Sequence, residues 1–296
     1  MMSWRLLKDF LFKKSAAVFL AVSLSVVLLI FVGLGYKSLP LLQSESIINI
    51  LTQSVWSPLK GNFGFLPFIM GTIWVTFIAL IIAVPLCLLA SAYLAEYASD
   101  RLKNFVLPLV NVLAAIPPVL FGVWGILFVV PILSDYIGPA FGITSSGYSV
   151  FAGGIVLAVM IFPIMISIMV EVLKTIPEEL KAASLSLGAT KWETIKKVVF
   201  VKAKPGIFAA VVLAISRAFG ETIAVLMVCG NIPQIPKGLF DAGYPLPALI
   251  ANNFGEMMSI PLYDSALMFA ALLLFVIIFG FNFLSRVILN RLEEKA

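Results

Sequence analysis

An arginine and a glutamate stand four residues apart inside one of the most apolar stretches of the chain. The stretch runs from Ile215 to Asn231 and contains Arg217 and Glu221. Positions i and i+4 of an α-helix lie on one face, so a continuous helix here would bring the two side chains together. An arginine at the middle of a membrane helix costs about 2.5–3.5 kcal/mol on insertion scales. The pair therefore indicates either an ion pair that holds a membrane helix in its bundle or a polar pathway across the membrane.

The rest of the chain has the composition of a membrane protein. Of its 296 residues, 61% are hydrophobic and 12% are charged, whereas soluble domains carry about 25% charged residues. Six apolar segments are long enough to cross about 30 Å of hydrocarbon. They are expected near residues 15–36, 67–95, 105–133, 149–173, 206–230 and 264–289. We therefore predict an all-α membrane protein with six transmembrane helices.

The basic residues predict how these helices are oriented. With the N-terminus inside, 16 of the 20 Lys and Arg residues fall on the cytoplasmic side, as the positive-inside rule requires. These are Arg5, Lys8, Lys13, Lys14, Arg101, Lys103, Lys174, Lys181, Lys191, Lys196, Lys197, Lys202, Lys204, Arg286, Arg291 and Lys295. We expect residues 1–14 to form a cytoplasmic N-terminus and 15–292 the transmembrane domain, with both termini cytoplasmic. The first apolar run lacks a small-x-small cleavage site, which favours a retained helix over a signal peptide.

Several classes of chemistry lack the residues that they need. The chain has no histidine, and its two cysteines, Cys87 and Cys229, lie inside apolar runs. These facts argue against a disulfide framework, a Cys/His metal site and His-based acid–base catalysis. We find no paired carboxylates of the kind a membrane enzyme would use, and we expect no cofactor.

The longest cytoplasmic segment, residues 174–205, carries clear helix signals. Pro177 suits the first turn of a helix that should stop at Gly188. Thr190 and Glu193 form a capping box, which starts a second helix. In that helix one apolar face is predicted from residues with helical spacing: Trp192, Ile195, Val198 and Val199. The segment is either an amphipathic helix on the lipid headgroups or an elbow on which a partner protein docks.

The elbow resembles the EAA loop of ABC-transporter permeases. Counted from Gly188, the Glu-Ala-Ala positions are Ala182, Ala183 and Ser184, and Ile-x-Leu-Pro falls on 198–201. The spacing matches, although Ala182 replaces the Glu and Val201 the Pro. Further strings narrow the resemblance to the PstC-type permeases of phosphate (Pst) importers. These strings are Trp56-Ser-Pro58, Phe63-Gly-Phe-Leu-Pro67, Ala115-Ile-Pro-Pro118, Leu187-Gly-Ala-Thr-Lys-Trp192 and, most specific, Arg217-Ala-Phe-Gly-Glu-Thr222 with its continuation to Asn231.

The resemblance implies a fold, partners and roles. The fold is the MetI-like ABC importer permease fold of a prokaryotic inner membrane. The partners are a second, PstA-like permease, a dimer of PstB-like ATPases, a PstS-like extracytoplasmic phosphate-binding protein and membrane lipid, with no nucleic acid. No Gly-x4-Gly-Lys-Ser/Thr loop is present in the sequence, so ATP hydrolysis is expected in the partner chain. Coupling to that ATPase is expected through Ala182, Ala183, Ser184 and Gly188.

The substrate pathway is expected at Arg217, Glu221 and Thr222. The guanidinium presents a fork of donors that matches phosphate oxygens, and we hypothesise that phosphate displaces Glu221 from Arg217. Ser216 and Thr222 are expected to bond mainly to helix carbonyls, and Asn231 to cap the helix.

Three alternatives remain open at this point. Arg217 and Glu221 could form a permanent structural ion pair, and the substrate could be another oxyanion such as sulfate or molybdate. A channel that acts alone is the third alternative, but it would need no docking elbow.

Pro117 and Pro118 break the third predicted span, either to shape the pathway or as a packing kink.

Overall fold

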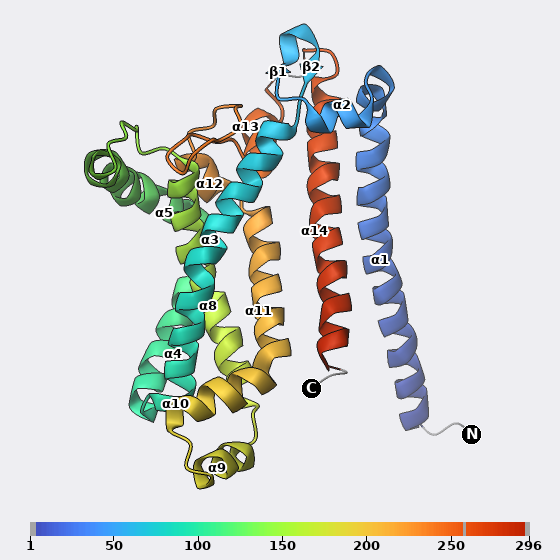
Figure 1. Cartoon of the computed structure of the whole chain (residues 1–296). Helices are drawn as coiled ribbons and strands as arrows, with labels where there is room; N and C mark the ends of the chain where they lie inside the picture. The colour runs from blue at the N-terminus through green and yellow to red at the C-terminus, as the bar shows by residue number, and fades with distance from the viewer. Residues whose placement is uncertain (1–3, 257–258, 294–296) are drawn as a thin grey trace.

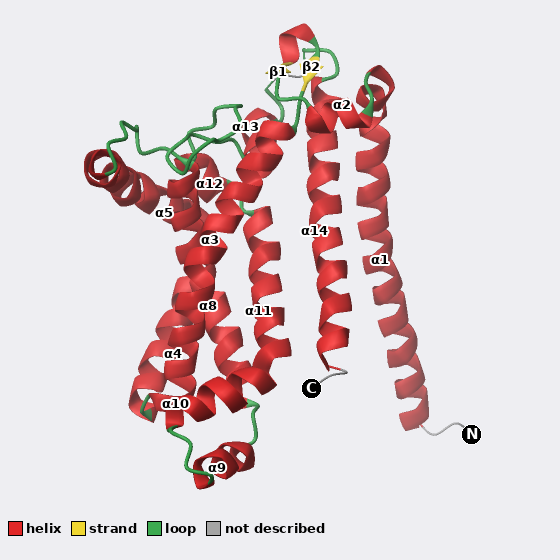
Figure 2. Ribbon diagram, in the orientation of Figure 1, coloured by secondary structure: helices red, strands yellow, loops and turns green. Residues whose placement is uncertain are grey.

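The computed structural model describes residues 4–256 and 259–293, and its regular structure is almost entirely helical (Figures 1 and 2). The first half contains α1 (Trp4–Ser44), α2 (Ile47–Thr52), β1 (Trp56–Ser57), η1 (Pro58–Lys60), β2 (Asn62–Phe63), α3 (Leu66–Ala92), η2 (Tyr93–Tyr97), α4 (Asp100–Ala115), α5 (Pro118–Trp124), η3 (Gly125–Val129), α6 (Val130–Ile132), η4 (Leu133–Ile137) and α7 (Gly138–Ala140). The second half contains α8 (Val150–Lys174), α9 (Glu178–Ser186), α10 (Lys191–Thr194), η5 (Ile195–Val199), α11 (Phe200–Gly220), α12 (Ile223–Val228), α13 (Leu246–Asn253) and α14 (Tyr263–Glu293). The segment η1 is a 3-10 helix, and η2 to η5 are π-helical turns.

Six helical stretches are long and apolar enough to cross a membrane, as predicted. They are Lys8–Ser44, Leu66–Tyr97, Pro118–Ala140, Val150–Lys174, Lys191–Gly220 and Tyr263–Arg291. The first of these begins earlier and ends later than the predicted 15–36. Of the basic residues used to predict the orientation, Lys295 lies outside the described residues.

The predicted third span, 105–133, is wrong in its boundaries because a helix break falls inside it. The helix α4 ends at Ala115, Ile116 is extended, and a new helix begins at Pro118. A proline disfavours helical backbone at the residue before it and suits the first turn of a helix itself. The expected break at Pro117 and Pro118 is therefore confirmed, and the membrane-length helix is the one that follows it.

The predicted fifth span, 206–230, is wrong at both ends. The helix begins at Lys191 in the elbow and continues through η5 and Pro205 to Gly220. Proline inside a helix removes one backbone hydrogen bond, which neighbouring helices can tolerate in a membrane bundle. The second elbow helix and the fifth membrane helix are thus one continuous rod.

The main contact in the bundle is between α3 and α8. A side chain at Gly154 of α8 would clash with Ile78 of α3, and one at Gly153 would clash with Cys229 and press against Val75 of α3. Small residues at such a contact let two membrane helices approach closely. Buried side chains continue the contact toward the elbow, among them Ala83, Leu157, Ile161 and Met165.

Residues 37–66, between the first two membrane-length helices, fold into a compact unit that includes the β1–β2 hairpin. The indole of Trp56, on the β1–β2 hairpin, packs edge-on against Phe68 and Phe65, with ring centroids 4.8 and 5.4 Å apart. Phe63 and Phe65 are fully buried. These aromatic rings form a compact cap over the ends of α3 and α14 that lie opposite the elbow, because edge-to-face packing favours a cluster over exposure.

The two described ends of the chain lie toward the same end of the bundle as the elbow helix α9 (Figure 1). The β1–β2 hairpin and α13 lie toward the other end. This arrangement is what an even number of crossings requires.

Candidate functional site

Arg217 lies in the last turn of α11, and the helix ends three residues later at Gly220. Glu221 is extended, with φ −71° and ψ 127°, and the short helix α12 begins at Ile223. The prediction that Arg217 and Glu221 share one helical face is therefore wrong. Glycine is a weak helix former, so the chain leaves helical geometry directly after Gly220.

Local hydrogen bonds stabilise this break. The hydroxyl of Thr222 donates to the carbonyl of Gly220 over 3.2 Å. The carboxylate Oε1 of Glu221 accepts the backbone N–H of Ala224 over 3.2 Å. Both contacts satisfy backbone groups that the interrupted helix would leave unpaired. Asn231 acts as the predicted cap, because its Nδ2 donates to the carbonyl of Leu226 over 2.7 Å.

Glu221 is buried and points into the protein. Its exposure is 9%, and it lines a small cavity together with Thr72 and Thr76 of α3. A carboxylate at the first N–H groups of a helix is favoured by the helix dipole. Glu221 thus holds the start of α12 in the described structure.

Arg217, by contrast, is exposed on the single chain. It takes part in none of the ion pairs or side-chain hydrogen bonds between described residues. The neighbouring Ser216 Oγ lies 3.1 Å from the carbonyl of Val212 and 3.0 Å from Asn282 Oδ1 on α14. The hydroxyl of Ser216 therefore has hydrogen-bond partners within the bundle, as expected. The guanidinium of Arg217 remains available to groups outside this chain.

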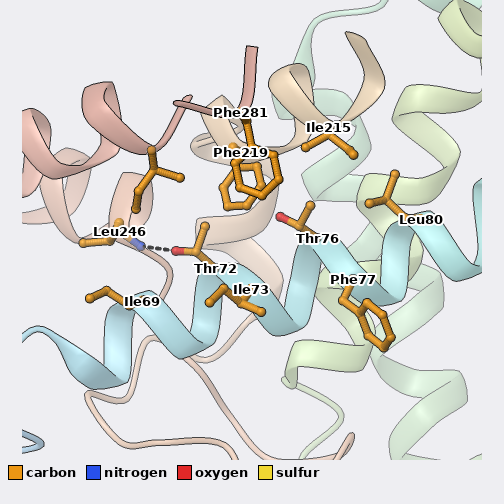
Figure 3. Close-up of a pocket in the computed structure, with 11 residues that line it drawn as sticks. Ile69, Thr72, Ile73, Thr76, Phe77, Leu80, Ile215, Phe219, Leu246 and Phe281 are labelled. Carbon is orange, nitrogen blue, oxygen red and sulfur yellow. Dashed lines mark hydrogen bonds between the residues drawn. The ribbon is translucent and has the colours of Figure 1, made fainter. Parts of the chain in front are cut away.

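A cavity of about 380 Å³ lies between α3, α11 and α14 (Figure 3). Its wall is apolar, and the hydroxyl of Thr72 already accepts the N–H of Leu246 over 2.9 Å. Ile215 and Phe219 face the cavity, so Arg217, which lies between them in the sequence, points to the opposite side of a helix with 3.6 residues per turn. The cavity does not suit an anion and is separate from the arginine.

The elbow has the local structure that the sequence predicts. Gly188 follows α9 with φ +82° and donates its N–H to the carbonyl of Leu185 over 2.9 Å, which is typical of a helix C-terminus. The capping box is present: Glu193 Oε2 accepts the N–H of Thr190 over 3.0 Å, and the hydroxyl of Thr190 accepts the N–H of Glu193 over 3.2 Å.

The predicted coupling residues lie on or near the surface of this elbow. Ala182, Ala183 and Gly188 are exposed, while Ser184 is half-buried with its Oγ 3.0 Å from Oγ1 of Thr194. Three leucines are exposed beside them: Leu180 by 39%, Leu185 by 48% and Leu187 by 89%.

The apolar face predicted for the second elbow helix is only partly correct. Ile195 and Val199 are buried against Leu173 and Ala203, and Val198 is half-buried. Trp192 is 48% exposed, so the packed part of this face begins at Ile195.

Sequence reasoning missed an ion pair that joins the elbow to α3. Lys181 Nζ lies 2.7 Å from Glu96 Oε1 and 2.9 Å from Glu178 Oε1, and the side chains of Lys181 and Glu96 are 11% and 10% exposed. Burial lowers the pKa of Lys181, but the hydrogen bonds and charges of the two carboxylates outweigh it, so the pKa is raised overall. The one signal in the sequence is a carboxylate, Glu96, directly after a long apolar run.

Known proteins of similar sequence point to one family. The profile of the family described as "Binding-protein-dependent transport system inner membrane component" matches residues 87–295. The phosphate transport system permease protein PstC of Pasteurella multocida (strain Pm70) is 34% identical over 261 residues, which cover 83% of this chain and 81% of that protein. The probable phosphate transport system permease protein PstC of Methanocaldococcus jannaschii is also 34% identical, with 88% and 86% covered. The probable ABC transporter permease protein YqgH of Bacillus subtilis (strain 168) is 34% identical, with 94% and 89% covered.

Solved structures of similar fold agree with this assignment. An inward-facing MetNI methionine ABC transporter has a chain with a TM-score of 0.55 and 20% identity, covering 84% of this chain and 98% of that one. A bacterial ABC transporter involved in the import of the polysaccharide alginate gives a TM-score of 0.55 at 17% identity, with 96% and 99% covered. These likenesses confirm the MetI-like permease fold. The chain belongs to the family of binding-protein-dependent transport system inner membrane components and is a multi-pass transporter permease rather than an enzyme.

Proposed function

We propose that the chain is a permease subunit of an ATP-binding-cassette importer for inorganic phosphate and that Arg217 contacts the anion. The observation that carries the second part is the exposed guanidinium in a membrane helix, without a carboxylate partner among the described residues. An arginine left in this state in a membrane is costly unless a partner outside the chain completes it. The names of the phosphate permeases at 34% identity support phosphate as that partner.

The role expected of Glu221 changes. Its carboxylate caps α12 and is buried near Thr72 and Thr76, so it is not held by Arg217 as a resting counter-ion. We propose that Glu221 fixes the break that presents Arg217, and that Thr222 supports the same break through the carbonyl of Gly220. The anion would then be the first group to complete the fork of Arg217 donors.

The elbow is the proposed docking site for the ATPase. Exposed leucines beside Ala182, Ala183 and Gly188 offer an apolar surface at the end of the bundle where the two described chain ends lie. We propose that this end is cytoplasmic, with residues 1–14 as a cytoplasmic N-terminus and 15–292 as the transmembrane domain. A second, PstA-like permease, two PstB-like ATPases and a PstS-like phosphate-binding protein would complete the importer.

Uptake of radiolabelled phosphate tests this proposal. The chain would be expressed with its partner subunits in cells that lack their own high-affinity phosphate system, with excess sulfate or molybdate as competitors. We expect uptake that resists both competitors and is lost in Arg217→Gln, with the amount of assembled complex unchanged. Uptake that sulfate or molybdate abolishes would show that another oxyanion is the substrate. Undiminished uptake by Arg217→Gln would refute the role of Arg217.

A further inference from the structure

The ion pair between Glu96 and Lys181 is buried, although charged side chains are rarely buried in proteins. Lys181 and Glu221 are the charged residues of the described chain that reach an exposure as low as 9%. Removing two charges from water carries a desolvation penalty that their attraction does not always repay. Such a pair contributes little stability compared with an apolar pair of the same size, but it fixes the relative position of the two elements that carry it.

The backbone around Glu96 is specialised. Glu96 lies in η2, a π-helical turn at the inner end of α3, which closes with a bond from the N–H of Ala98 to the carbonyl of Tyr93 over 2.9 Å. A π-turn adds a residue to the helix and changes the direction of the side chains that follow it. In this case the turn is followed by the end of the helix, and Glu96 meets Lys181 on α9.

The elbow is joined to the helix break by two helices. One is the continuous rod from Lys191 to Gly220, which carries Arg217. The other is α3, which runs about 30 Å from Glu96 to Thr76, where it lines the cavity that holds Glu221. The chain connects α9 to the first helix through the Gly188 turn, and the Lys181–Glu96 pair connects α9 to the second.

We propose that Glu96 and Lys181 are positioning residues that fasten the elbow helix α9 to α3. A displacement of the elbow by the ATPase would then move α3 together with α11, and both helices would act on the break that presents Arg217. The proposal rests on the proposed function, since it requires an ATPase that docks on the elbow.

Reconstituted transporter in lipid vesicles tests the pair. Two single variants, Glu96→Gln and Lys181→Met, remove one charge each. Lys37→Met is the matched control, because Lys37 pairs with Asp264 over 3.6 Å at an exposed site outside the elbow. Coupling between sites typically amounts to 5- to 150-fold. We therefore expect the phosphate moved per ATP hydrolysed to fall about fivefold or more in both singles and to stay unchanged in the control.

A charge swap provides the rescue. The variant Glu96→Lys with Lys181→Glu is made in a Glu178→Gln background, since Glu178 would otherwise repel the new carboxylate. The swap should restore most of the transport per ATP relative to Glu178→Gln alone. Transport and ATP hydrolysis that fall in proportion with the amount of assembled complex, leaving their ratio unchanged, would overturn the proposal and make the pair structural only.

Hydrogen exchange of the assembled complex separates this inference from the proposed function. In the single variants the amide hydrogens of α9 should exchange faster than in the wild type, while the exchange rates in α11 should be unchanged. Wild-type complex that moves no phosphate would refute the proposed function, and the exchange of α9 would still decide whether the pair fastens the elbow. Exchange of α9 that does not differ between wild type and the singles would overturn the inference.

Discussion

The elbow and the helix break differ in whether their charged side chains are paired with one another. At the elbow, Lys181 is buried between two carboxylates, and Lys197 lies 3.4 Å from Glu193. At the break, Arg217 and Glu221 are separated: the arginine is exposed, and the glutamate is buried on a backbone N–H. At the elbow these charges are paired within the chain, whereas at the break Arg217 has no charged partner among the described residues.

This difference distinguishes charges that maintain structure from a charge that awaits a partner. An ion pair completed inside the chain can hold two helices together in every state of the protein. An arginine without a charged partner in a membrane-spanning helix has a high free energy. An anion or a second subunit that binds the guanidinium can lower it. The following predictions test this contrast, in order of decreasing effect.

Substitution of Arg217 should have the largest effect. Arg217→Gln should lower phosphate transport roughly 10- to 100-fold, because it removes charged hydrogen bonds to the anion. Arg217→Lys keeps the charge but loses the fork of donors, so it should fall between wild type and Arg217→Gln. Initial uptake rates normalised to the amount of complex measure both effects. Full activity of Arg217→Lys would show that no bidentate contact exists.

Substitution of Gly188 tests whether the elbow depends on its turn. Gly188→Ala should cost about 1–2 kcal/mol of stability, because its φ of +82° is left-handed and no atom lies within 4 Å of the added Cβ. Gly142→Ala is the matched control, with φ +70° and equally open surroundings. Thermal unfolding in detergent should show similar losses for both variants.

The two glycine variants should differ in binding of the ATPase. Gly188→Ala should reduce co-purification of the ATPase, since the turn orients α9, whereas Gly142→Ala should leave it intact. Equal co-purification by both variants would mean that the elbow docks without this turn.

Substitution of Glu221 separates a helix cap from a counter-ion. Glu221→Ala removes the acceptor of the Ala224 N–H and should cost about 1 kcal/mol in thermal unfolding, as loss of a cap does. Glu221→Gln retains an oxygen acceptor and should stay close to wild type. If Glu221 instead served as the counter-ion of Arg217, the glutamine variant would be as damaging as the alanine variant.

The elbow should be insensitive to pH across the physiological range. The pKa of Lys181 is raised above the usual 10.5, so the stability it contributes is fully present below that value and is lost as the pH rises through the higher folded value. Exchange of the α9 and α10 amides, corrected for intrinsic rates, should therefore be flat from roughly pH 6 to 9. A transition within that window would show that another group controls the elbow.

The sequence alone was sufficient wherever the signal lies within a few neighbouring residues. Apolar runs predicted the number of membrane helices, and Pro117 and Pro118 predicted the break between α4 and α5. Gly188 and the Thr190–Glu193 capping box predicted both sides of the elbow turn. These features depend on local backbone geometry and hydrogen bonds, and their residues are adjacent in the chain.

Tertiary structure alone decided which charges meet. The apolar pattern continues through Gly220 to Val228 and favours an unbroken helix, but the Glu221 carboxylate on the Ala224 N–H and its packing beside α3 stabilise a break. Glu96 and Lys181 are far apart in the sequence, and only the packing of α9 against the end of α3 brings them to 2.7 Å. The physical reason is that burial and partners of a charge depend on surfaces supplied by distant segments, whereas helix starts and stops depend on neighbouring residues.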